Sequence, residues 1–222
     1  MTQAISTVIA PGSDCRDAFR AAYENRYTWE PGFGGYRGRC VWIQGDRRVE
    51  GTFTVGADLK AAVDGVEDAE VQKAIASQLW EVAIHRVRRG FDQVHGENTF
   101  TAGETTEEGL EVIIGGKGDG DRYCIKNDVV TMVHRHIHGT VVTIHTGTTT
   151  DTGTGYLSRT YTSQYADPDT GKLRGGLSRF EDTFVPLCEN GPWILESRVV
   201  RTEENNFVSS EQSFQFLNCE AL

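Results

Sequence analysis

The residues best suited to chemistry in this sequence are histidines, and four of the six lie between residues 134 and 145. Imidazole changes its charge near neutral pH and is the commonest metal ligand in proteins. Three neutral imidazoles on one face could hold zinc and leave a position open for water, as catalytic zinc sites do. They could also act as general acids or bases, or hydrogen-bond neighbouring threonines and carboxylates. We therefore take His134, His136 and His145 as candidate catalytic residues. We expect no cofactor, with zinc on these three residues as the alternative.

The order of residues around these histidines predicts a β-hairpin that gathers them on one face. His138 and Gly139 can form its two-residue turn, because glycine adopts positive φ without strain. This turn sets the cross-strand pairs, which are 137 with 140, 136 with 141, 134 with 143 and 132 with 145. The candidate histidines then share a face, and the opposite face carries the apolar set Val133, Ile137, Val142 and Ile144. An unbroken strand from 129 to 145 would instead move His145 to the other face.

The elements that must position this hairpin are mostly strands. A short helix is predicted over 13–27 and one long helix over 67–90, where apolar residues recur at helical spacing between an acidic start and an arginine-rich end. The predicted strands are 39–43, 49–55, 59–63, 98–103, 110–115, 121–126, 129–137, 140–149, 156–165, 177–187, 193–201 and 207–217. Because most strands follow one another with no helix between them, the sheet should be antiparallel, in an α+β fold.

Length and charge narrow the class of protein. A chain of 222 residues suits one large β-rich domain, and we expect a single α+β domain over 13–222 after a disordered or extended N-terminus over 1–12. The net charge is −10. An acidic chain repels phosphate backbones, so nucleic acid is excluded as a general partner.

The cysteines and the first residues bear on the compartment. The five cysteines are scattered, odd in number and without a CxxC pair, which indicates free thiols in a reducing environment. The first fourteen residues lack the basic and apolar regions of a signal peptide. No window approaches the ~18 apolar residues of a membrane span. We therefore expect a cytoplasmic protein with no membrane span.

Several sequence segments match those of a known family and occur in the same order. They are FRAAYENRYTW (19–29), QLWEVAIHRVRR (78–89), HGENTF (95–100), VHRHIHG (133–139), DTGTGYL (151–157) and FEDT (180–183). From about residue 13 to about residue 198 the chain resembles the uncharacterised, mainly cyanobacterial family known as domain of unknown function 3386. The resemblance implies an oxygenic phototroph as the source. It transfers no catalytic residue, because the family has no established activity.

The order of predicted elements is also similar, more distantly, to the LolA/LolB lipoprotein carriers. That resemblance implies a half-barrel, in which a single curled antiparallel sheet packs around the long helix and encloses an apolar cavity. The short N-terminal helix fits the same plan. The chain departs from the carriers in showing no signal peptide, which argues against a role in carrying lipoproteins across a periplasm.

These observations favour a non-enzymatic protein that binds a hydrophobic or amphipathic small molecule, lipid- or pigment-like, in a phototroph. The residues we expect to line its cavity are Trp42, Phe53, Trp80 and Met132. One alternative is an enzyme that uses the histidine cluster, with or without zinc. Another is an assembly factor that binds a protein partner through the exposed face of the sheet.

Overall fold

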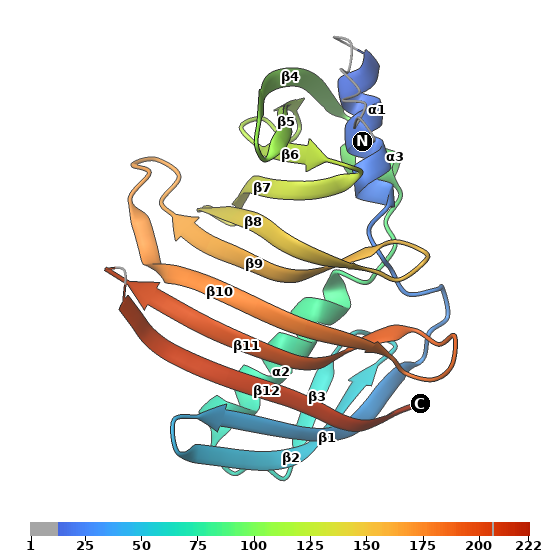
Figure 1. Cartoon of the computed structure of the whole chain (residues 1–222), viewed down its shortest axis with the longest axis vertical. Coiled ribbons are helices and arrows are strands. Elements are labelled where there is room, and N and C mark those ends of the chain that lie inside the picture. The colour runs from blue at the N-terminus through green and yellow to red at the C-terminus, as the bar shows by residue number, and fades with distance from the viewer. Residues whose placement is uncertain (1–12, 206) are drawn as a thin grey trace, which may run out of the picture.

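One open antiparallel sheet of twelve strands makes up most of the molecule (Figure 1). The computed structural model describes residues 13–205 and 207–222. The N-terminus predicted to be disordered or extended, residues 1–12, lies outside the described residues. Within the described residues, no helix is both long enough and apolar enough to cross a membrane.

The sheet consists of two meanders, one of the first three strands and one of the other nine, which pair through the first and the last strand of the chain. The strands are β1 (Gly35–Gln44), β2 (Arg47–Gly56), β3 (Ala61–Asp64), β4 (Asn98–Thr106), β5 (Gly109–Gly116), β6 (Arg122–Lys126), β7 (Val129–Ile137), β8 (Thr140–Asp151), β9 (Tyr156–Ala166), β10 (Leu173–Pro186), β11 (Trp193–Glu204) and β12 (Phe207–Ala221). Their order in the sheet is β3-β2-β1-β12-β11-β10-β9-β8-β7-β6-β5-β4. The last strand therefore pairs with the first, and β1–β3 extend the sheet beyond the C-terminal end of the longer meander. The predicted single antiparallel sheet is confirmed.

The hairpin of β7 and β8 has the predicted turn and register. His138 and Gly139 have φ of 49° and 74°, and a type I′ hairpin turn requires positive φ at both central residues. Four pairs match the predicted register: Ile137 with Thr140, His136 with Val141, His134 with Thr143, and Met132 with His145. The predicted division of this hairpin into a histidine face and an apolar face is therefore confirmed.

Replacing Gly139 with valine should lower the free energy of unfolding by about 1–2 kcal/mol, the cost of left-handed backbone for a residue with a side chain. A Cβ atom at this position meets no heavy atom within 4 Å, so the effect should be purely conformational. Urea unfolding measures it, with Gly139→Asn as the matched control because asparagine tolerates positive φ. Equal stability of the two variants would contradict this explanation.

The described residues form three helices, of which the two predicted ones are shorter than expected and the third was not predicted. They are α1 (Ser13–Glu24), α2 (Ala69–Ile84) and α3 (Phe91–His95). Asp68 caps α2, its carboxylate accepting hydrogen bonds from the backbone N–H groups of Glu70 and Val71. The predicted helix 67–90 is wrong at its end, because the Arg86 carbonyl accepts a hydrogen bond of 2.8 Å from the Trp29 N–H of the preceding connector. A contact distant in sequence thus replaces the last helical turn.

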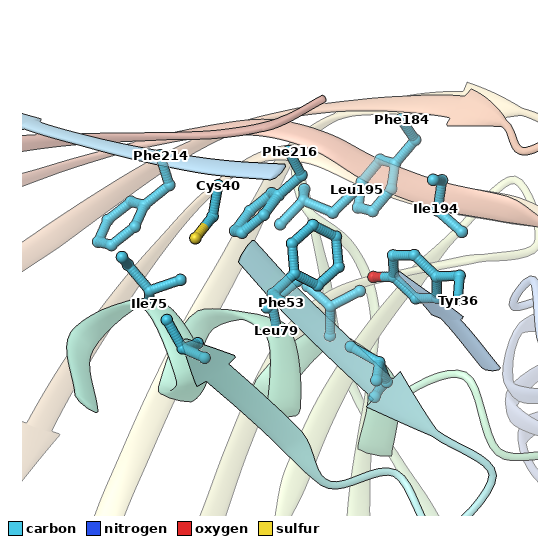
Figure 2. Close-up of a cluster of buried hydrophobic side chains, with 14 of the residues drawn as sticks. Tyr36, Cys40, Phe53, Ile75, Leu79, Phe184, Ile194, Leu195, Phe214 and Phe216 are labelled. Atoms are coloured by element: carbon cyan, nitrogen blue, oxygen red, sulfur yellow. The ribbon is translucent and has the colours of Figure 1, made fainter. Parts of the chain in front are cut away.

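The sheet does not pack around one long helix, which corrects the predicted arrangement. α2 packs on β1–β3 at one end of the sheet, while α1 and α3 lie at the β4–β7 end (Figure 1). Figure 2 shows the first core, where Ile75 and Leu79 of α2 meet aromatic side chains such as Phe53 and Phe216. Phe19 and Phe91 lie at the centre of the second core. We call α2 one helical cover, and α1 together with α3 the other. The middle of the sheet lies between these two covers.

Candidate functional site

The three candidate histidines share a face but bind three different partners. His134 Nδ1 and Thr143 Oγ1 form a hydrogen bond of 2.9 Å. His145 Nδ1 donates to a Glu108 carboxylate oxygen at 2.6 Å. His136 donates twice to one oxygen of Asp121, from its backbone N–H at 2.9 Å and from Nδ1 at 3.4 Å. Each imidazole therefore forms its hydrogen bond with a different residue.

The structure supplies two carboxylates that sequence reasoning could not pair with the histidines, because both are distant along the chain. Glu108 lies in the turn between β4 and β5, and Asp121 lies just before β6. Within residues 13–205 and 207–222, no three or more His, Cys, Asp or Glu side chains are grouped so as to hold a metal ion. Zinc binding by these histidines stays a prediction.

The four residues expected to line a cavity lie in separate places. Trp42 and Phe53 are buried in the core beneath α2, where Trp42 Nε1 donates to Gln212 Oε1 at 2.9 Å. Trp80 is 51% exposed on α2. Met132 is buried on the histidine face of the sheet, where its strand neighbour is Cys124. None of the four lines the cleft described next, so the predicted wall is not the wall of this cleft.

A cleft of about 400 Å³ lies on the helix-bearing face, between the two helical covers. Its walls come from α1, the end of α2, the segment that leads into α3, and strands β6–β11. One part is apolar, formed chiefly by Val87, Val94, Val133, Ile137, Val142 and Ile144. The apolar face of the histidine hairpin thus forms part of this wall, while the histidines themselves point to the opposite side of the sheet.

Charged residues form the other part of the cleft. Arg198 on β11 is 2% exposed, and Asp182 opposite it on β10 is 1% exposed. Arg198 Nε and Nη2 donate to the two carboxylate oxygens of Asp182, each at 2.7 Å. The same guanidinium donates to Tyr161 Oη at 2.7 Å and to Gln78 Oε1 at 2.9 Å. This bidentate, fully hydrogen-bonded pair is the arrangement in which two buried charges are tolerated.

Arg86 lies beside this pair and is bonded differently. Its guanidinium carbon lies 5.2 Å from the centre of the Phe184 ring. Its Nε is buried and has no hydrogen-bond partner among the described residues. Burial lowers the pKa of this guanidinium to about 10, against the opposing effect of Asp182. Arg86 therefore remains a cation at neutral pH, in a place where its positive charge is poorly compensated.

His95 of α3 also lines the cleft, at its other end. It is 5% exposed and surrounded by aromatic rings, the nearest being Phe19 at 4.9 Å between ring centres. Asn98 Nδ2 donates to its Nδ1 at 3.1 Å, so the ring proton sits on Nε2. Burial lowers the pKa of His95 to about 4, and the nearby Arg135 and Arg26 add to the effect. This imidazole is neutral at pH 7.

Sequence reasoning missed Arg86, Asp182 and Arg198 as site residues. It assigned Arg86 to the arginine-rich end of a helix, and Asp182 and Arg198 to predicted strands, with no site role for any of them. One signal was available: Asp182 stands two residues from both Phe180 and Phe184, on the face that an alternating strand buries. A charge at a core position of a strand needs a buried partner, which for Asp182 is Arg198.

The fold and the cleft together define an α+β protein with one open antiparallel sheet and an amphipathic cleft between its helices. The chain belongs to the family described as "Protein of unknown function (DUF3386)", whose model matches residues 10–222. The predicted family resemblance is confirmed, and the match extends beyond the segment that carried it. No curated protein matches the chain.

Two solved structures are similar to this chain over most of its length. A LolA superfamily protein from Nitrosomonas europaea has 8% sequence identity and a TM-score of 0.33, over 94% of this chain and 93% of that one. A DUF1329 family protein from Desulfovibrio piger has 9% identity and a TM-score of 0.29, over 95% of this chain and 93% of that one.

Proposed function

We propose that this protein is a non-enzymatic binder of a hydrophobic or amphipathic small molecule, and that the cleft between the helical covers holds it. The cleft itself is the observation that carries the proposal. Its volume of about 400 Å³ lies within the ~300–1,000 Å³ typical of ligand pockets. It also combines an apolar wall with a few converging polar groups, which is the usual composition of such pockets.

The setting we propose is the cytoplasm. All five cysteines are free, which supports a reducing compartment. In an oxygenic phototroph, which the family resemblance implies, lipids, pigments and their precursors are the natural candidate ligands. A protein whose cleft holds such a molecule should release it into organic solvent, where mass spectrometry identifies it.

Filling the cleft should abolish binding of Nile red, an uncharged apolar dye whose fluorescence rises in apolar surroundings. Ile144 lines the cleft from β8 and Ser158 lines it from β9, so Ile144→Trp and Ser158→Trp each place an indole in the space. Thr149→Trp is the matched control, because Thr149 is exposed on β8 and outside the cleft. Fluorescence titration measures the dye affinity of each protein.

The expected result is loss of dye binding in both cleft variants and normal binding in the control. Circular dichroism and thermal melting show whether each variant is folded, and two independent cleft variants keep the test sound should one of them unfold. Equal dye affinity in the wild type and in a folded cleft variant would contradict the proposal.

A further inference from the structure

The cleft is cationic although the protein as a whole is acidic. The chain carries a net charge of −10. The cleft, in contrast, is lined by five arginines and only two carboxylates: Arg26, Arg86, Arg89, Arg135 and Arg198 against Glu81 and Asp182. A low-dielectric wall strengthens the field of such a cluster and draws in ions of the opposite sign.

Pairing within the cleft leaves part of this positive charge free. The buried pair described above uses Arg198 and Asp182, and Arg135 lies 3.2 Å from an oxygen of Asp121. Among the described residues, no carboxylate oxygen lies within 4 Å of a guanidinium nitrogen of Arg26, Arg86 or Arg89. The unpaired cations therefore outnumber the carboxylates available to them.

Among these cations, Arg86 has a buried guanidinium nitrogen without a hydrogen-bond partner in the described part of the chain. The two oxygens of Asp182 already accept from Arg198, and the Arg86 Nε is buried without a partner. A buried donor left unsatisfied costs about 1–3 kcal/mol, and more when it is charged. Arg86 also lines the cleft, so an anion there would compensate its charge, and guanidinium groups bind carboxylate and phosphate groups strongly.

Arg135 lies beside the apolar wall and is paired with Asp121, but the apolar wall and the unpaired Arg86 are separated across the sheet. Val142 and Ile144 lie on β8, while Arg198, next to Arg86, lies on β11. Three strand spacings separate β8 from β11, roughly 14 Å in all. A ligand that contacts both regions therefore needs a polar end and an extended apolar body. The volume of the cleft suits one chain of this kind.

We propose that the ligand is a single-chain amphiphile with an anionic end, a carboxylate or a phosphate, and that Arg86 binds this end while the chain lies against Val142 and Ile144. The inference rests on the proposed function and specifies the chemical class of the ligand.

The first test is a ligand series on the wild-type protein. Calorimetric titration compares dodecanoate, dodecyl phosphate, dodecanol and dodecyltrimethylammonium, all below their micellar concentrations. The four probes share one chain length and differ in the polar end. At least one anion should bind about tenfold or more tightly than dodecanol, as a charge-assisted hydrogen bond provides. The cation should bind weakest. The order of dodecanoate and dodecyl phosphate then tells whether the natural ligand ends in a carboxylate or a phosphate.

The second test removes the charge at Arg86. Arg86→Gln should reduce the affinity for the anionic probes about tenfold or more and leave the affinity for dodecanol unchanged. Arg86→Lys should retain part of the preference, because it keeps the charge but not the fork of donors. The matched control is Arg159→Gln, which removes the same charge from an exposed position outside the cleft and should change nothing.

The two proposals fail in different ways. Dodecanol binding as tightly as both anions in the wild type would overturn the anionic end and leave the small-molecule binder standing. Unchanged anion affinity in folded Arg86→Gln would overturn the role of Arg86 and leave the small-molecule binder standing. In contrast, Nile red binding that persists in the folded cleft-filling variants would contradict the cleft as the binding site. The wild-type series does not depend on any variant folding.

Discussion

Replacing Arg198 with methionine should lower the free energy of unfolding by about 3–5 kcal/mol, the usual effect of removing one member of a buried ion pair. Arg198 and Asp182 are almost completely buried and face each other across β11 and β10. Burial raises the pKa of the Asp182 carboxyl, and the facing guanidinium opposes this effect. Without Arg198, the carboxylate remains in a low-dielectric site without its bidentate partner, and the nearby Arg86 forms no ion pair with it within 4 Å. Urea denaturation measures the loss.

A double-mutant cycle separates the charge effect from lost packing. Arg198→Met combined with Asp182→Leu should cost much less than the sum of the two single changes, because neither member of the pair then stays buried without the other. The control on the same strand is Arg201→Met, which breaks an ion pair with Glu211 at the surface and should cost less than about 1 kcal/mol. Additive single and double effects would show that the two side chains act independently, against this prediction.

Acidification should destabilise the protein through His95. The pKa of this buried imidazole is about 4 in the folded state, against ~6.5 in an unfolded chain. Between these values the unfolded chain binds a proton that the folded protein does not, so stability falls as the pH falls. The contribution of His95 to this loss should be about 2 kcal/mol between pH 7 and pH 4.5. Urea denaturation at the two pH values measures it.

The matched variant is His95→Phe, which keeps an aromatic ring among Phe19 and Phe91 but cannot take a proton. Its stability should fall less than that of the wild type over the same pH range, by about 2 kcal/mol. His138→Asn changes an exposed histidine in the β7–β8 turn and should keep the wild-type pH dependence. Identical pH dependence of His95→Phe and the wild type would refute the assignment to this residue.

Local patterns in the sequence determined most of the sheet. Strands with alternating polarity and turns with specific chemistry are short-range signals, and they placed every strand within a few residues. The β7–β8 hairpin shows this best: a two-residue turn with Gly139 at positive φ leaves only one register, and the register decides which face each histidine takes.

The end of α2 depended on tertiary structure. Helical periodicity continues through the arginines, but the hydrogen bond from Trp29 to the Arg86 carbonyl takes the chain out of the helix. No local pattern encodes a contact between residues so far apart in sequence. The change places Arg86 beside the cleft instead of on a helical surface.

The position of the candidate site also depended on tertiary structure. The sequence identified the histidines by residue type, yet their side chains lie on the face away from the helices and bind separate partners. The cleft instead arises where two helical covers stop short of each other, and its charges come from β10, β11 and the segment after α2. A local pattern reports which face of an element is apolar. Only the packing of elements distant in sequence decides where a cleft remains between them and which charged residues are buried in it.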